Sequence, residues 1–445
     1  MSHNIFHDYD IRGRYPGEVN EAVFYRLGQA IYQIIKSQKI AIARDGRLSS
    51  DTLFLYLAAS LIKKGVKVVD LGRASTPFCF WYSQKYRTDA LMITASHNPK
   101  DQNGLKIYTY KNGPIDKESG LLKIKQKYET LPAGLESIDS QSSNIKRVDV
   151  SVEYQKFILR ETKKISPKIR LAIDFSNGPA GLEIIPILEK LKMNFATLNE
   201  NPDGRFPGHG PNPLEEANQK AISLLTKSKK FNLGMLVDGD GDRVVFFDEQ
   251  GEAIDANFIA CVIMGHGLVG KKGGIVKTVS LGRIVDEVAQ TQGIKVYVSK
   301  VGRSYVRRLV ENKKADWGVE KSGHYFFKEF YSGDNPLVAL IYILRILSKN
   351  KEPLSKLIKP YQKYVILPEV NIPYQGHFYH TIKTLEEKFA DGKISELDGL
   401  KIDYPSWGFS LRRSNTENLW RLILEGISRE EVEKYKKEVE EILQS

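Results

Sequence analysis

Cysteine is nearly absent from the 445-residue sequence, which contains only Cys79 and Cys261. Two distant thiols give neither a disulfide framework nor a cysteine-based zinc site, so a reducing compartment is expected. Long apolar runs are also missing. The most apolar stretches, at 258–269 and 337–347, are each interrupted by a polar or charged residue and fall short of the ~20 residues of a membrane span. The amino-terminal residues lack the apolar centre of a signal peptide. These absences predict a cytoplasmic protein without a membrane partner.

The composition shows no bias toward disorder or fibrous structure. Hydrophobic residues make up 41% and charged residues 27%, with 35 Gly and 18 Pro, as in ordinary globular proteins. The length exceeds what one hydrophobic core supports and predicts about two to four domains. The net charge of +12 favours anionic partners such as phosphorylated metabolites or nucleic acids. Because the sequence has no dense Lys/Arg run or basic-aromatic platform, we expect no nucleic-acid partner.

One strand–helix–strand pattern occurs three times, at 39–72, 170–198 and 273–302. Each copy has a short apolar strand, a turn of small or polar residues, an amphipathic helix and a second apolar strand. Parallel strands need such helical crossovers, so the pattern predicts three similar α/β domains with mixed, largely parallel sheets. The last ~80 residues alternate short strands with turns and end in an amphipathic helix over 428–445, which predicts a smaller α+β domain.

The spacing of the copies sets the expected domain limits. A polar run at 136–147 and a turn-rich stretch at 360–375 look like connections between domains. The predicted domains are 1–148, 149–250, 251–362 and 363–445.

Three aspartates alternate with two glycines between apolar runs, at Asp238, Asp240 and Asp242. Crowded carboxylates either bind a cation or have raised pKa values, and oxygen ligands on a flexible turn favour Mg²⁺ over Ca²⁺. With Glu249 the spacing matches an EF-hand loop, but the required central glycine is replaced by Arg243 and the flanks read as strands. We therefore predict a magnesium loop, the alternative being a polar hairpin turn without a metal.

Three further segments carry chemistry. Ser96 and His97 follow an apolar strand, with Lys106 ten residues after Ser96, so Ser96 is a candidate nucleophile or the cap of a turn. A second segment has carboxylate, hydroxyl and imidazole groups two residues apart, which on an extended chain would face one side and suit sugar hydroxyls: Glu320, Ser322 and His324. A third has groups that match phosphate geometry: Arg412, Arg413, Ser414, Asn415, Thr416 and Arg421. The plain alternatives are a surface loop and a hairpin turn.

Four motifs, TASHNP, DGDGDR, EKSGH and RRSNTE, occur in this order with one in each predicted domain. Together they resemble the α-D-phosphohexomutase family and are most similar to its phosphomannomutase/phosphoglucomutase branch. The resemblance implies three similar α/β domains and a smaller fourth domain around a central cleft. It also implies an isomerase that interconverts hexose 1-phosphate and 6-phosphate, of mannose, glucose or both, through a phosphoserine and a hexose 1,6-bisphosphate.

The resemblance assigns roles to individual residues. Ser96 would carry the phosphoryl group, and one Mg²⁺ per chain would be bound by Asp238, Asp240, Asp242 and the Ser96 oxygen. The other residues of the catalytic set would be His97, Lys106, Arg243 and Arg12. The residues that contact the substrate would be Tyr9, Glu320, Ser322, His324, Arg412, Ser414, Asn415 and Thr416.

Two departures bear on these expectations. Asn418 stands where the family usually has proline, so the shape of the phosphate loop can differ. Thr94 in TASHNP favours mannose and glucose, since phosphoglucosamine mutases more often have serine there. The alternatives are a phosphoglucosamine mutase and, from another class, a non-catalytic protein that binds metal and polyanions. The expected partner is a phosphorylated hexose, and the expected state is a monomer or a homodimer.

Overall fold

The structure is a computed structural model that describes residues 5–132, 134, 145–160, 162, 165–267, 272–373, 378–414 and 419–444. The chain forms two compact units. Unit 1 is Met1–Ile254 with Ser322–Ser355, and unit 2 is Asp255–Lys321 with Lys356–Ser445. Among the described residues, no helix is long and apolar enough to cross a membrane.

The first sheet of unit 1 has the strand order β1-β5-β4-β2-β3-β7, with β6 paired to β5. Strand β2 lies parallel to both β3 and β4, whereas β5 lies antiparallel to β4 and β1. The strands are β1 Ile11–Arg14, β2 Lys39–Arg44, β3 Lys67–Arg73, β4 Asp89–Ile93, β5 Gln102–Thr109, β6 Gly113–Pro114 and β7 Ile145–Arg147. The helices are α1 Glu21–Ile35, α2 Ser50–Lys63, α3 Thr76–Tyr86, the π-helical turn η1 Lys117–Leu121 and α4 Leu122–Thr130.

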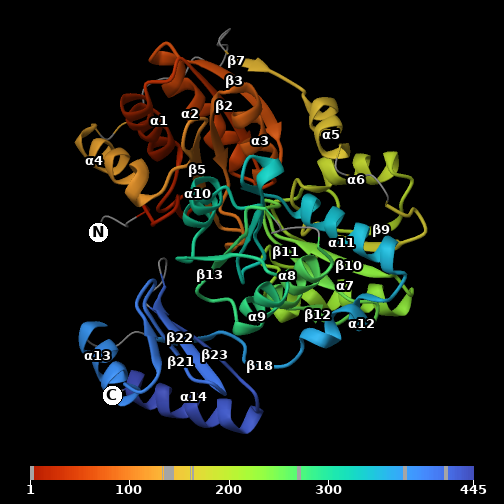
Figure 1. Ribbon diagram of the computed structural model, residues 1–445. Helices are drawn as coiled ribbons and strands as arrows, with labels where there is room; N and C mark the ends of the chain where they lie inside the picture. Colours follow the sequence, from red (N-terminus) through yellow and green to blue (C-terminus); the bar gives the residue numbers. More distant parts are fainter. Residues whose placement is uncertain are drawn as a thin grey trace. The chain divides into compact units, whose positions relative to one another are not determined.

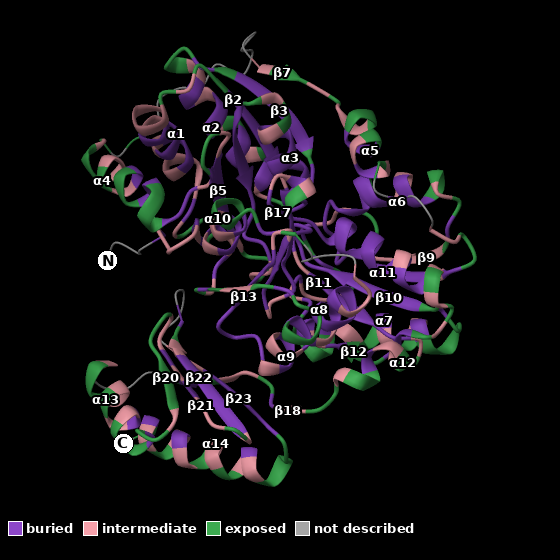
Figure 2. Cartoon of the chain, viewed as in Figure 1, coloured by how far each residue is buried: buried purple, intermediate pink, exposed green. Residues whose placement is uncertain are grey.

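Helices cover both faces of this sheet. Because β2 lies between β3 and β4, right-handed crossovers place α2 and α3 on opposite faces, as Figure 1 shows. Helix α3 begins where the Ser75 side chain accepts a hydrogen bond from the Phe78 amide, next to the helix-starting Pro77. The inner strands are buried throughout (Figure 2). Because both of their faces are covered, their sequences are nearly continuous runs of apolar residues.

The second sheet of unit 1 has the order β12-β11-β10-β8-β9. Strand β8 lies parallel to β9 and β10, and β10 forms an antiparallel hairpin with β11. The turn of this hairpin is the predicted metal loop, residues 238–243. The elements are α5 Ser151–Leu159, β8 Arg170–Asp174, α6 Gly181–Lys190, β9 Asn194–Leu198, α7 Glu216–Ser228, β10 Leu233–Val237, β11 Val244–Phe247 and β12 Ala253–Ile254.

The third α/β domain contributes to both units. In unit 2, β13 lies parallel to β14 and β15. In unit 1, β16 and β17 form an antiparallel hairpin that leads into the buried helix α11. The elements are α8 Ala256–Gly265, β13 Ile275–Thr278, α9 Arg283–Thr291, β14 Val296–Ser299, α10 Arg303–Lys313, β15 Trp317–Val319, β16 Tyr325–Phe327, the 3₁₀ turn η2 Lys328–Phe330, β17 Gly333–Asp334, α11 Pro336–Asn350 and α12 Leu354–Ile358.

The last part of unit 2 is a sheet of order β18-β23-β22-β21-β20, with β19 paired to β23. Its core includes Trp407 and Trp420, against which α14 packs Val432 and Val439. The elements are the 3₁₀ turn η3 Lys359–Tyr361, β18 Val365–Ile366, β19 Val370–Pro373, α13 Phe378–Lys388, β20 Lys393–Ser395, β21 Leu400–Asp403, β22 Trp407–Arg413, β23 Leu419–Gly426 and α14 Arg429–Gln444.

The predicted fold class is confirmed: three α/β domains with mixed sheets and a smaller α+β domain. The two stretches interpreted as plain connections were partly wrong. Residues of β7 form the edge of the first sheet beside β3, and β18 and β19 pair with β23. Short edge strands carry a weak apolar pattern, because water reaches part of each.

Candidate functional site

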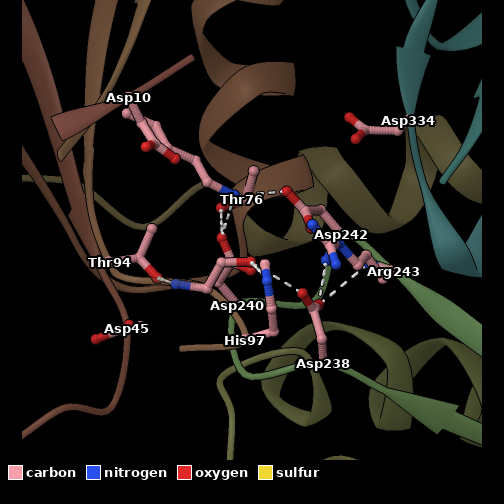
Figure 3. A network of polar contacts seen from close by, with 12 residues as sticks. Asp10, Asp45, Thr76, Thr94, His97, Asp238, Asp240, Asp242, Arg243 and Asp334 are labelled. Carbon is pink, nitrogen blue, oxygen red and sulfur yellow. Dashed lines mark hydrogen bonds and ion pairs between the residues drawn. The ribbon is translucent and has the colours of Figure 1, made fainter. Parts of the chain in front are cut away.

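The candidate site of unit 1 lies beyond the carboxyl ends of buried strands. Ser96 follows β4 by three residues, Asp238 directly follows β10, and Thr76 begins α3 after β3. In open α/β sheets this edge carries the ligand site, because loops there connect strands to helices without disturbing the core. Figure 3 shows Asp238, Asp240 and Asp242 around one point with His97 beside them.

Ser96 has a left-handed backbone conformation, with φ of 53°. Its amide donates a 2.8 Å hydrogen bond to the Thr94 hydroxyl, which helps to hold this uncommon conformation. The Ser96 hydroxyl donates to Asp238 Oδ2 at 3.0 Å, and Nδ1 of His97 lies 3.3 Å from the same hydroxyl oxygen. The predicted nucleophile and the metal loop therefore meet in one buried site.

The three aspartates of the loop are fully buried and are close enough to share one ion. One oxygen from each lies within 4.8 Å of the others. Asp238 Oδ1 accepts the amides of Asp242 and Arg243 at 2.9 and 3.1 Å, which closes the turn. Gly241 has φ of 75° and permits this turn, and a Cβ there would lie 2.8 Å from the Ala180 Cβ.

Two neighbours, one cationic and one neutral, donate hydrogen bonds to these carboxylates. Lys106, on β5, donates to Asp240 at 2.6 Å and to Asp242 at 2.7 Å, and the Thr76 hydroxyl donates to Asp240 at 2.6 Å. Burial and the adjacent charges of Asp240 and Asp242 raise the pKa of Asp238 well above its usual range. Burial also opposes ionisation of Asp240, but Lys106 keeps the pKa of that carboxyl below its ordinary value.

Arg12, on β1, contacts the serine loop. Arg12 is held by two hydrogen bonds to Asp10, at 2.7 and 2.5 Å, and by a third to the Asn98 side chain at 2.9 Å. Burial, Arg243 and Arg12 lower the pKa of His97 well below that of a free imidazole, so His97 is neutral at pH 7. Tyr9 is half-buried and immediately precedes Asp10.

A chain of contacts orients Arg243. The Arg243 Nε–H donates to Nε2 of His324 at 3.1 Å, and Nδ1 of His324 lies 2.8 Å from the Asp334 carboxylate. Because Nε2 accepts from Arg243, a neutral His324 carries its proton on Nδ1, the nitrogen that lies near Asp334. No other described residue accepts a hydrogen bond from the Arg243 side chain, so its Nη groups remain available to a ligand.

The sugar segment is a loop, but it is not extended, so its three side chains do not share one side as an extended chain would require. Residues 321–323 form a turn between β15 and β16, and Gly323 has φ of 89°. A Cβ on Gly323 would lie 2.5 Å from the Val244 carbonyl, so this close approach bends the chain. Within unit 2, Glu320 accepts the Gly302 amide at 2.8 Å, whereas His324 belongs to unit 1 and Ser322 is half-buried there.

The predicted phosphate segment lies in unit 2, where β22 ends. Arg412 is 3.8 Å from Glu369, which also pairs with Arg421 at 2.7 Å. Ser414 is buried, and its amide donates to the Leu419 carbonyl. Asn415 and Thr416 lie outside the described residues.

Sequence reasoning missed three residues of the site in unit 1: Asp10, Thr76 and Asp334. Thr76 could have been found, because it follows β3 and the carboxyl end of a parallel strand is where site residues gather. Asp334 lies 92 residues after Asp242, so only the folded chain places it beside His324.

Glu183 contacts this region from α6, where its Oε1 accepts the Ser75 amide at 2.7 Å. Burial raises the pKa of Glu183 to about 8. Between about pH 4.5 and 8 the folded protein keeps a proton that the unfolded chain releases, so stability falls as the pH rises, by up to about 1.4 kcal/mol per pH unit. We expect Glu183→Gln, which keeps the acceptor, to flatten this fall when urea unfolding is measured at pH 5 and pH 8.

The matched control for that variant is Glu189→Gln, since Glu189 is exposed on the same helix. It should leave the pH dependence of unfolding unchanged. Equal pH slopes for Glu183→Gln and the unmodified protein would contradict the raised pKa.

Three family models match most of the chain. They describe the phosphoglucomutase/phosphomannomutase alpha/beta/alpha domains I, II and III, and match residues 3–133, 152–251 and 255–364. The chain belongs to the phosphoglucomutase/phosphomannomutase branch of the α-D-phosphohexomutase family. The resemblance drawn from the four motifs is thereby confirmed, and the protein is an enzyme of the hexose phosphate mutase class.

Relatives of this mutase align with nearly its full length. A phosphomannomutase of Methanocaldococcus jannaschii is 33% identical over 98% of this chain and 96% of its own. A phosphomannomutase/phosphoglucomutase of Pseudomonas aeruginosa is 29% identical over 97% and 94%. A solved structure of a family protein from Burkholderia thailandensis has a TM-score of 0.87 and 26% identity, and the match covers 99% of this chain and 97% of that one.

Proposed function

We propose that this mutase interconverts the 1- and 6-phosphates of mannose, glucose or both, with Ser96 as the carrier of the phosphoryl group. The observation that carries the proposal is the 3.0 Å contact between the Ser96 hydroxyl and Asp238 inside a buried carboxylate cluster. A hydroxyl on a strained turn beside three acids has no evident structural purpose, whereas a reversible phosphate carrier needs such surroundings.

The cluster fits one Mg²⁺ ion. The donors are hard carboxylate oxygens, and Oδ1 of Asp240 is buried without a hydrogen-bond partner among the described residues. Asp238, Asp240, Asp242 and the Ser96 oxygen would hold the ion. When bound, Mg²⁺ would supply charge neutralisation for the phosphoryl oxygens.

The residues of this chain then divide the chemistry. As the phosphoryl group leaves Ser96 Oγ, the bond from phosphorus to Oγ breaks and a bond to a sugar hydroxyl oxygen forms, while the hydroxyl proton passes to a base. His97, neutral at pH 7, is the candidate for accepting that proton, and the Lys106 ammonium is the candidate proton donor. The resulting hexose 1,6-bisphosphate returns its other phosphoryl group to Ser96, which completes the isomerisation.

Charged groups support this transfer. The Nη groups of Arg243 can bind phosphoryl oxygens in the two-pronged geometry of a guanidinium, and Arg12 and Tyr9 lie on the segment beside the serine loop. We assign the sugar hydroxyls to Glu320 and Ser322. The phosphate that does not react is assigned to a set in the last domain: Arg412, Ser414, Asn415 and Thr416. We further propose a cytoplasmic location, and a monomer or homodimer.

A coupled assay of turnover on the 1-phosphates of glucose, mannose and glucosamine tests the proposal. We expect Mg²⁺-dependent turnover on glucose or mannose 1-phosphate, stimulated by hexose 1,6-bisphosphate. A preference for glucosamine 1-phosphate would favour the phosphoglucosamine mutase. Binding of polyanions with a steep salt dependence and no turnover would contradict the mutase assignment.

Asp334 should matter although it is remote from the serine. We expect Asp334→Asn to lower kcat by about 10–100-fold, because the amide no longer fixes the His324 tautomer that orients Arg243. Measurement of kcat together with the nitrogen chemical shifts of His324 checks this. A loss of activity with the Nδ1–H tautomer retained would contradict the orienting role.

A further inference from the structure

We propose that Arg47 is the residue that positions Ser96, through a guanidinium clamp on the backbone of the serine loop, residues 96–102. Strands β2 and β4 are parallel neighbours, and Arg44 on β2 pairs with Ile93 on β4. Arg47 and Ser96 each lie three residues beyond this pair. The topology of the sheet therefore brings the two loops side by side.

Every N–H of the Arg47 guanidinium has an acceptor, and four of the five acceptors are carbonyls of the serine loop. One Nη donates to Ser96 and Asn98 at 2.8 and 2.7 Å, and the other to Pro99 and Gln102 at 2.6 and 2.8 Å. The Nε–H donates to the Asp45 carboxylate at 3.1 Å. A planar fork that reaches four carbonyls fixes the path of the loop as well as its position.

The serine loop depends on this clamp. Ser96 has its φ at 53°, a conformation that an L-residue keeps only when its surroundings impose it. Its amide is fixed by the Thr94 hydroxyl, and its carbonyl by Arg47. With both peptide groups held, the Cα–Cβ bond of Ser96 has a fixed direction, from which the hydroxyl reaches Asp238.

The clamp is itself held rigidly. Arg47 is 2% exposed, and its partner Asp45 also accepts the Ser50 hydroxyl at 2.7 Å. The Phe206 ring lies 5.3 Å from the guanidinium carbon. Figure 3 shows Asp45 on the Thr94 side of the site. A buried cation with this many partners has little freedom to move.

The same carbonyl also meets the metal loop. A Cβ on Gly239 would lie 2.8 Å from the Ser96 carbonyl oxygen, so the metal loop packs against the group that Arg47 binds. On the other side, a Cβ on Gly204 would lie 2.5 Å from the Arg47 Cα. Arg47 thus sets the distance between the serine loop and the carboxylates.

This inference rests on the proposed function, because it assigns Arg47 to the placement of a phosphoryl carrier. Arg47 itself touches neither the hydroxyl nor the carboxylates, so it is a positioning residue. Its loss should therefore slow the transfer step and leave substrate binding nearly intact. If Arg47 had only a structural role, its replacement would instead lower the stability of the protein and the fraction of molecules that are active.

The test is Arg47→Lys, which keeps the charge beside Asp45 but has a single donor point that cannot reach four carbonyls. The turnover rate is expressed per phosphorylated site. The number of these sites is measured by intact-mass analysis after incubation with glucose 1,6-bisphosphate. We expect kcat per phosphorylated site to fall about 100-fold, because a shift of the reacting group by about 1 Å has an effect of this size. KM should stay within about threefold of the value for the unmodified protein. If this variant does not fold, the double variant Arg47→Gln with Asp45→Asn, which removes both charges of the buried pair, replaces it with the same expectation.

Arg44→Lys is the matched control. Arg44 is a half-buried arginine of β2 whose guanidinium pairs with Asp51 and Asp70. Among the described residues it makes no hydrogen bond or ion pair to residues 96–102. It should lower the melting temperature without changing kcat per phosphorylated site. An unchanged kcat in folded Arg47→Lys would overturn the positioning role, whereas full activity in Ser96→Ala would overturn the proposed function on which it rests.

Discussion

Replacing Ser96 by alanine should reduce mutase turnover to background, a loss of the order of 10⁴–10⁶-fold. The hydroxyl is the only group removed, and the bonds to the Thr94 hydroxyl and the Arg47 guanidinium that shape the loop use only backbone atoms of Ser96. The melting temperature should therefore change little. The measurement is a coupled assay with glucose and mannose 1-phosphates, together with circular dichroism.

Ser83→Ala is the control for that result. Ser83 is also a buried serine of the first domain, but it lies on α3 and its hydroxyl has no hydrogen-bond partner among the described residues. It should retain full turnover. Full turnover in Ser96→Ala would remove the phosphoserine from the mechanism.

Replacing Asp240 by asparagine should weaken the dependence on magnesium most strongly among single changes in the loop. In the part of the chain that the structure describes, one of its oxygens is buried without a hydrogen-bond partner, and the other accepts from Lys106 and Thr76. Loss of a ligand charge should raise the Mg²⁺ concentration for half-maximal activity by more than about tenfold, since changes in outer-shell partners alone cost about 10–100-fold. We also expect kcat to fall about 10²–10³-fold. A magnesium titration of activity and of binding measures both effects.

Asp248→Asn makes the same chemical change on a carboxylate outside the cluster. Asp248 is buried after β11 and accepts the amides of Gln250 and Glu252, which an asparagine oxygen can also do. Its magnesium titration should match that of the unmodified protein. Superimposable titrations for Asp240→Asn and Asp248→Asn would argue against the metal loop.

The repeated strand–helix–strand units were predictable because each is a local pattern. The strand at Arg170–Asp174, the helix at Gly181–Lys190 and the strand at Asn194–Leu198 follow one another within 30 residues. The aspartate cluster was predictable for the same reason, since its ligands lie within five residues of one another. Local spacing is enough when turn and strand geometry decide the neighbours.

Contacts between segments far apart in the sequence could not be predicted from local patterns. Lys106 could be noted for its place ten residues after Ser96, but its 2.6 Å contact with Asp240 spans 134 residues and follows from no local pattern. Arg47 looks like an ordinary charged loop residue in the sequence, yet it is buried against carbonyls that carry no side-chain signature. The turn at 321–323 was missed because the close approach of Gly323 to Val244 arises only after folding.

The most direct test of a phosphate carrier at Ser96 is mass spectrometry of the intact protein and of its peptides. After incubation with glucose 1,6-bisphosphate and Mg²⁺, the protein should gain the mass of one phosphate, located on the peptide that contains Ser96. That phosphate should be lost on addition of glucose or mannose 1-phosphate. A catalytically active protein that never carries phosphate on this peptide would contradict the account.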